Sequence, residues 1–108
     1  MRYFAISALL LSAPAVAVSV LPAASPGAAL FSEKCAMCHR GRGMGTVLLA
    51  RRMDPAIADL EKRTDLDPEM VKAVVRGGIG NMPAIPRGEV SDAQLTAIAT
   101  YLAAKKAP

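Results

Sequence analysis

Aromatic residues and metal-binding side chains are scarce in this chain. Its 108 residues include no tryptophan, two tyrosines and two phenylalanines, and they hold two cysteines and a single histidine. A tetrahedral zinc site needs about four ligands, so these three side chains cannot complete one. No strand pattern surrounds the cysteines, which argues against a thioredoxin-like redox pair. A small domain with so few aromatic rings usually needs a disulfide, a metal or a cofactor to support its core.

The two cysteines and the histidine belong to one motif, Cys35-Ala36-Met37-Cys38-His39. On one turn of helix the thiols of Cys35 and Cys38 face the same side, where they can add to the two vinyl groups of a porphyrin, and His39 then lies under the iron. This spacing is the attachment pattern of a c-type haem. A disulfide between the two cysteines is the alternative. We interpret the motif as the site of one covalently bound haem c.

The N-terminal part of the chain is typical of a secretory signal. Met1-Arg2 is followed by no charged residue from Tyr3 to Ala29, and the small residues Ala23-Ala24-Ser25 offer a cleavage site, with Ala15-Val16-Ala17 as a second candidate. We expect residues 1–24 to be a signal peptide, cleaved near Ser25. Haem attachment in bacteria takes place outside the cytoplasmic membrane, so the motif and the signal both indicate the periplasm. An uncleaved membrane anchor is the alternative, since the apolar stretch is long enough to cross a bilayer.

Prolines, glycines and capping residues divide the rest of the chain into short helices. A run of helix formers over 28–35, preceded by Pro26-Gly27, leads into the haem motif, and the glycines of 41–45 predict a flexible loop after it. Asp-Pro pairs predict helix starts for the segments 54–63 and 67–76. A capping box predicts the last helix over 91–104. No internal repeat is present, and we predict one all-α domain of three to five short helices.

The far face of a haem iron needs a second ligand, and the chain has no second histidine. Two methionines lie too close to His39 in sequence to reach round a porphyrin, one falls on the apolar face of a helix, and one has no loop signal around it. Met82 differs, because it lies in segment 77–86, whose glycines let the backbone approach a ligand and whose prolines stiffen it. We take His39 and Met82 as the axial pair. The rejected candidates are Met37, Met44, Met53 and Met70.

With these motifs the chain resembles the small class I cytochromes c, over residues 27–104. In that family a glycine and an aromatic residue of the first helix pack against an aliphatic and an aromatic residue of the last helix. The matching positions here are Gly27, Phe31, Ile98 and Tyr101. Met82-Pro83 fits the ligand loop of the family. The resemblance implies a class I cytochrome c fold, with residues 25–108 forming the cytochrome c domain wrapped around one haem.

Two positions depart from the family pattern. Thr46 stands where the family usually has a proline whose carbonyl accepts a hydrogen bond from the ligating histidine. Thr46 can still present a carbonyl to His39, so we expect that bond to be kept but held less rigidly. Ile85 stands where the family commonly has an aromatic residue, which keeps the pocket apolar but removes a ring.

Coordination of both iron faces by side chains predicts one-electron transfer, because no open site remains for a substrate or small ligand. We therefore expect an electron carrier and not an enzyme. Its partners would be redox proteins, a donor dehydrogenase and an acceptor oxidase or cytochrome, with no role for nucleic acid and no membrane span once the signal is removed. The alternatives are the cytochrome subunit of a flavin- or quinone-dependent dehydrogenase, or a haem sensor or catalyst in which Met82 is labile.

Charge gives a weaker indication of the partner. Removal of Arg2 with the signal leaves twelve basic and nine acidic residues, so the net charge steers little. A basic rim around the haem, meeting an acidic partner, is one hypothesis, and solvated side chains are the alternative. Arg51 and Arg52 are the candidates for contact with the haem propionates. The proposed rim consists of Lys34, Arg40, Arg42, Arg51, Arg52 and Arg87.

Overall fold

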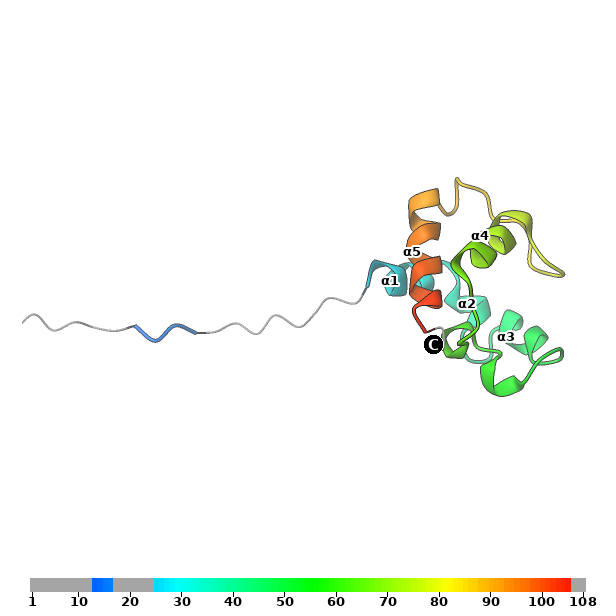
Figure 1. The fold of residues 1–108 in the computed structure, drawn as a ribbon, viewed down its shortest axis with the longest axis horizontal. Coiled ribbons are helices and arrows are strands. Elements are labelled where there is room, and N and C mark those ends of the chain that lie inside the picture. Colours follow the sequence, from blue (N-terminus) through cyan, green and yellow to red (C-terminus); the bar gives the residue numbers. More distant parts are fainter. Residues whose placement is uncertain (1–12, 17–24, 106–108) are drawn as a thin grey trace, which may run out of the picture.

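The computed structural model describes residues 13–16 and 25–105, and within them the chain is helical (Figure 1). Five α-helices and two short 3-10 helices follow one another in the order α1 (Pro26–Lys34), α2 (Ala36–His39), α3 (Met44–Leu49), η1 (Pro55–Ile57), η2 (Leu60–Lys62), α4 (Pro68–Gly77) and α5 (Asp92–Ala103). The described backbone holds one isolated β-bridge, between Ile79 and Met82. The all-α prediction is confirmed.

The predicted signal peptide lies almost entirely outside the described residues. Of residues 1–24 the structure describes 13–16, which are exposed and have no regular secondary structure. In the described segments, 13–16 and 25–105, none of the helices combines the length and the apolar character needed to cross a membrane.

Local side chains set the starts of the longer helices. The carboxylate of Asp67 accepts hydrogen bonds from the backbone N–H groups of Glu69 and Met70, and Pro68 occupies the first helical position of α4. Ser91 and Gln94 form a complete capping box at the start of α5. Both helices begin where the capping residues predict.

The segment between α3 and α4 corrects two of the predictions. Residues 54–63 do not form one helix, because the carboxylates of Asp54 and Asp59 each accept a hydrogen bond from the N–H two residues later and divide the segment into η1 and η2. The predicted loop at 41–45 is also too long, since α3 begins at Met44. Gly45 is a helical residue that packs against the preceding turn, where a Cβ would lie 2.8 Å from the backbone oxygen of Cys38.

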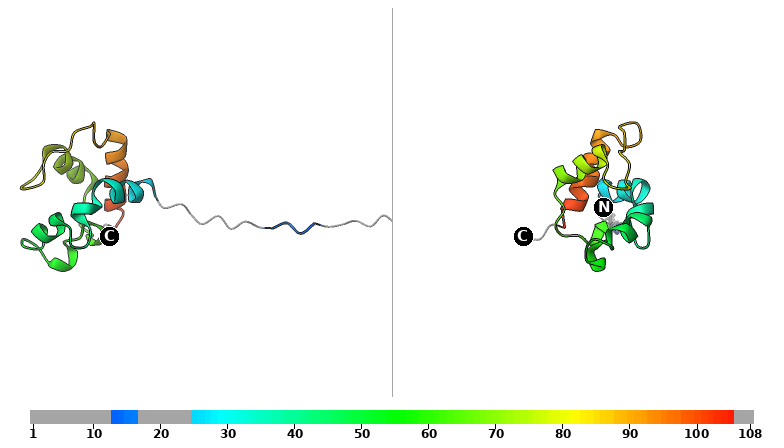
Figure 2. Two further views of the ribbon diagram at one scale, coloured as in Figure 1. Left: turned by 180° about the vertical axis from the view of Figure 1, so that it is seen from behind. Right: turned by 90° about the vertical axis from the view of Figure 1, so that its right-hand side faces the viewer.

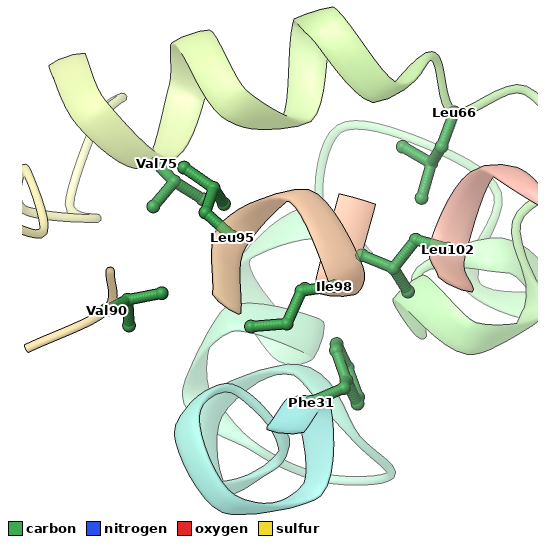
Figure 3. Packing of buried hydrophobic residues seen from close by; sticks show 7 residues of the cluster. All are labelled: Phe31, Leu66, Val75, Val90, Leu95, Ile98 and Leu102. Atoms are coloured by element: carbon green, nitrogen blue, oxygen red, sulfur yellow. The ribbon is translucent and has the colours of Figure 1, made fainter. Parts of the chain in front are cut away.

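The hydrophobic core forms where α1 and α4 pack against α5 (Figure 3). The rings of Phe31 and Tyr101 have their centroids 6.0 Å apart. A Cβ on Gly27 would lie 2.2 Å from the backbone oxygen of Ala97, so the close crossing of α1 and α5 requires glycine there. The predicted contact of the first and last helices is confirmed. The core residues are Phe31, Leu66, Val75, Val90, Leu95, Ile98 and Leu102.

Two segments extend from this core on the side away from the start of α1, as the views in Figures 1 and 2 agree. One is the loop that follows α4, drawn in yellow, and the other is α3 with the turn after it, drawn in green. One of these segments, the loop, therefore carries the predicted ligand Met82, and the other, α3, follows directly on the turn that carries His39.

Candidate functional site

A cavity of about 610 Å³ lies between these two segments, within the range of natural cofactor sites. Both cysteines, His39 and Met82 line it, together with residues of every α-helix of the described chain. Its walls are mostly aliphatic. Besides three methionines, the apolar lining side chains are Phe31, Leu48, Leu49, Leu60, Leu66, Val71, Val74, Val75, Ile79, Pro83, Ile98 and Leu102.

The Cys-x-x-Cys-His motif forms a helical turn, as its spacing predicts. The N–H of Cys35 donates to the carbonyl of Phe31 at 2.9 Å, and the N–H of His39 donates to the carbonyl of Cys35 at 3.0 Å. Cys35 is half-buried and Cys38 is exposed. Burial, with a smaller contribution from Cys38, raises the pKa of the Cys35 thiol. The turn thus presents two thiols and an imidazole to one cavity.

The imidazole of His39 packs closely against Gly45. A Cβ on Gly45 would lie 2.8 Å from Cε1 and 2.9 Å from Nδ1 of the ring, so any larger residue would displace it. Burial lowers the pKa of His39, and the nearby carboxylate of Asp59 opposes that shift. The ring is therefore held in the neutral form that binds a metal.

The hydrogen bond expected between His39 and the Thr46 carbonyl is not present. Nδ1 of His39 is buried and has no partner among the described residues. The Thr46 carbonyl instead accepts the N–H of Ala50 at 2.9 Å, because Thr46 is a helical residue of α3. The Thr46 hydroxyl is buried and likewise has no partner in the described part of the chain.

The loop that carries Met82 begins with two glycines in left-handed conformations. Gly78 ends α4 with φ 75° and Gly80 has φ 53°, values that other residues rarely adopt. Ile79 and Met82 exchange backbone hydrogen bonds of 3.0 and 2.9 Å, which closes a tight turn. Met82 is half-buried and packs against the core. The structure therefore places Met82 and His39 on the walls of the same cavity.

Arginines supply the positive charge of the cavity. Arg51 and Arg52 line it, as does Arg63, which the sequence analysis did not identify. Arg63 has 15% of its side chain exposed and donates two hydrogen bonds of 2.8 Å to the carboxylate of Asp65. No local signal marks Arg63, because its place on the cavity depends on the fold of η1 and η2. Three further members of the proposed rim are engaged in ion pairs, in the pairs Lys34–Glu33, Arg40–Glu61 and Arg87–Asp92.

The lining of this cavity fits a covalently attached haem. Two thiols lie on one helical turn, a neutral imidazole follows them, and a thioether lies on the opposite loop. The aliphatic walls suit a porphyrin, and the guanidinium groups suit its propionates. The buried and unpartnered Nδ1 of His39 shows that its ring is not committed to another hydrogen-bond role in the described protein. A domain of short helices around a cavity with this lining is typical of the small class I cytochromes c.

Comparison with known proteins gives the same result. Residues 22–102 match the family described as cytochrome C oxidase, cbb3-type, subunit III, and the chain belongs to this family of cytochromes c. Membership brings covalently bound haem c and the transfer of electrons, so the protein is an electron-transfer protein and not itself an enzyme.

Three relatives illustrate the range of the family. The chain is 38% identical to cytochrome c6 of Gloeothece citriformis (strain PCC 7424), over 76% of this chain and 71% of the relative. It is 35% identical to cytochrome c6 of Nostoc sp. (strain PCC 7120 / SAG 25.82 / UTEX 2576), over 73% and 68%. It is 34% identical to the cytochrome c subunit of 4-cresol dehydrogenase [hydroxylating] of Pseudomonas putida, over 76% of this chain and 62% of that relative. No solved structure matches the chain significantly.

Proposed function

We propose that this protein is a periplasmic one-electron carrier whose haem is attached through Cys35 and Cys38 and ligated by His39 and Met82. One observation carries the proposal: Met82, far from the motif in sequence, lines the same apolar cavity as the two thiols and the imidazole. A loop with two left-handed glycines and a closed turn brings it there.

The bound haem supplies one-electron exchange between ferrous and ferric iron. The protein contributes the rest. Cys35 and Cys38 would hold the porphyrin covalently, and the imidazole of His39 and the thioether of Met82 would ligate its iron, so that no open site would remain for a small ligand. A thioether ligand favours the reduced iron relative to a second nitrogen ligand. The aliphatic walls exclude water from the haem and raise the cost of charge on the iron.

Replacement of Met82 tests the ligand assignment. Met82→Ala should convert the iron from low spin to high spin and let the reduced protein bind carbon monoxide readily. Met70→Ala is the matched control, because Met70 lines the same cavity from α4 with 42% of its surface exposed. This control should keep the wild-type optical spectrum. A Met82→Ala protein with an unchanged spectrum would remove Met82 from the proposal, as would loss of the low-spin spectrum in Met70→Ala.

The covalent attachment can be tested separately. Haem should remain with the protein after denaturation and extraction with acidified acetone. Cys35→Ala and Cys38→Ala should each shift the absorption of the reduced haem, because one vinyl group is then left unreacted. Colourless protein with free or bridged thiols after correct maturation would exclude the proposed site.

Residues 1–24 are proposed as a signal peptide that directs the chain to the periplasm. The absence of charge from Tyr3 to Ala29 supports this. The intact mass of the mature protein should correspond to a chain that begins near Ser25, and the protein should be released when the outer membrane is opened. A full-length chain retained with the membrane would instead support the uncleaved anchor.

Arg51 and Arg52 are proposed to contact the haem propionates, and Arg63 joins them on the cavity wall. Loss of a nearby positive charge stabilises the ferric state, so Arg51→Gln and Arg52→Gln should each lower the reduction potential. Arg87→Gln is the control, since Arg87 is exposed and paired with Asp92. Electron-transfer rates that do not change with ionic strength would contradict a role of these arginines in steering an acidic partner.

As a second candidate function, the protein is the cytochrome subunit of a dehydrogenase. The 34% identity to the cytochrome c subunit of 4-cresol dehydrogenase supports it. Two apolar side chains of the cavity wall are also largely exposed, Met44 at 70% and Ile79 at 62%, as is Met37 of the attachment motif at 91%. A permanent subunit should co-migrate with a flavin or quinone enzyme during native purification. A carrier should purify as a free monomer.

A further inference from the structure

Arg76 joins α4 to three separate points of the chain that follows it. Its Nη1 donates to the carbonyl of Ile85 at 3.0 Å and to the carbonyl of Val90 at 2.9 Å, and its Nη2 donates to the carboxylate of Asp92 at 2.8 Å. The side chain is 19% exposed. One guanidinium thus spans the second half of the Met82 loop and the first turn of α5.

Ile85 is held to α4 through both of its backbone groups. Its N–H donates to the carbonyl of Val75 at 2.8 Å, while its carbonyl accepts from Arg76. On the other side of Met82, the turn that joins Ile79 to Met82 is closed by two hydrogen bonds. The backbone between these two fixed points is short, so little freedom remains for Met82. Displacement of its side chain from the cavity requires the Ile85 anchor or the turn to open.

We propose that Arg76 is a positioning residue for Met82, which keeps the thioether in the cavity by fixing the loop at Ile85 and Val90. The inference rests on the proposed ligation by Met82. Hydrogen bonds from a charged donor to a carbonyl are stronger than neutral ones, and two of them are lost together if Arg76 is removed. The free energy needed to open the loop is then lower, and an external ligand competes more easily for the position that Met82 occupies.

Arg87 provides a matched control. It also donates to the carboxylate of Asp92, at 2.9 Å, but its side chain is 71% exposed. Arg87→Gln therefore removes the same charge from the same carboxylate without touching the carbonyls of Ile85 and Val90. Arg76→Gln removes the loop anchor as well. Arg76→Lys retains the charge and the reach to a single carbonyl, and so serves as the conservative variant.

The test measures displacement of the methionine by imidazole in the ferric haem protein. Arg76→Gln should bind imidazole at least roughly tenfold more tightly than the wild type does. Before imidazole is added, its thioether-to-iron absorption band should be weaker than that of the wild type. Arg87→Gln should stay within about twofold of the wild type. The affinity of Arg76→Lys for imidazole should lie between those of Arg76→Gln and Arg87→Gln. Arg76→Lys replaces Arg76→Gln in the comparison if Arg76→Gln does not yield haem-loaded protein.

Met82→Ala separates failure of this inference from failure of the ligand assignment. If Met82→Ala keeps the wild-type absorption band, Met82 is not the ligand and the proposed function falls. If Met82→Ala loses the band while Arg76→Gln and Arg76→Lys bind imidazole as Arg87→Gln does, the ligand assignment stands. The positioning role of Arg76 is then wrong.

Discussion

Replacement of Glu61 by glutamine should lower the free energy of unfolding by about 2 kcal/mol at pH 7. The Glu61 side chain, 19% exposed, accepts a hydrogen bond from Nε of Arg40 at 2.5 Å and another from the hydroxyl of Tyr101. Its backbone carbonyl also accepts Nζ of Lys105 at 2.6 Å. This Glu61 cluster ties the residue after His39 to the last helix.

The magnitude follows from the two contacts of the carboxylate. A hydrogen bond from Tyr101 to a charged acceptor contributes about 1.5–3 kcal/mol, and a neutral amide acceptor retains about 0.5–1.5 kcal/mol of it. The ion pair with Arg40 adds less, because that side chain is 45% exposed. Glutamine keeps the shape of the side chain, so no cavity contributes to the loss.

The stabilisation should depend on pH. The hydrogen bond from Arg40, and a further one from Tyr101, lower the pKa of Glu61 below its ordinary value of 4.5, although burial opposes the shift. A carboxyl whose pKa is lower in the folded protein stabilises the fold above its unfolded pKa and loses that contribution as the pH falls through the folded value. The difference between the wild type and Glu61→Gln should therefore shrink below pH 4.5.

Urea unfolding of the haem-loaded protein at several pH values provides the measurement. Glu69→Gln is the control, because Glu69 pairs with Lys72 on the surface with 78% of its side chain exposed, and its loss should change the stability by less than about 0.5 kcal/mol. The reasoning is refuted if Glu61→Gln matches this control at pH 7. A large difference that stays constant far below pH 4.5 would refute the electrostatic origin.

Three further substitutions test the packing by urea unfolding. Gly27→Ala should cost about 3 kcal/mol, since the new Cβ would lie 2.2 Å from the backbone oxygen of Ala97; a neutral result would show that α1 can shift. Gly77→Ala should instead stabilise the protein by about 0.5 kcal/mol, because no atom outside the adjoining residues and backbone of α4 lies within 4 Å of the new Cβ, and a loss of stability would contradict that open space. Leu102→Ala should cost about 2–5 kcal/mol at a position 2% exposed; a loss below about 1 kcal/mol would mean that the core collapses around it.

The sequence predicts those parts of the fold that local residues decide. Asp67 and Ser91 cap the helices that follow them, as expected from their neighbours alone. The segment 54–63 was predicted wrongly, because Asp59 also accepts the N–H of Gly41 at 3.0 Å, a contact that no local pattern indicates. Helix α3 was missed, since its glycine serves the approach of the His39 ring and hides the helical pattern.

The candidate site divides in the same way. The attachment motif is contiguous, so its residues can be read directly, and the glycines around Met82 give a local signal for a loop. The supporting residues give none. Glu61 and Tyr101 are forty residues apart, and Arg76 reaches Val90 across fourteen. Charged residues of this kind are common on solvated surfaces, and their partners become known only when the chain is folded.

Helix α5 connects the two segments that carry the proposed iron ligands. Near its start, the carboxylate of Asp92 accepts a hydrogen bond from Arg76, which also donates to the carbonyl of Ile85 in the Met82 loop. Near its end, Tyr101 donates to Glu61, which holds Arg40 directly after His39. The residues between these ends include three buried core residues, Leu95, Ile98 and Ala99, each at most 3% exposed. A change in how α5 packs therefore moves the supports of both ligand segments together, so that the core stability and the ligation of the iron should vary as one property.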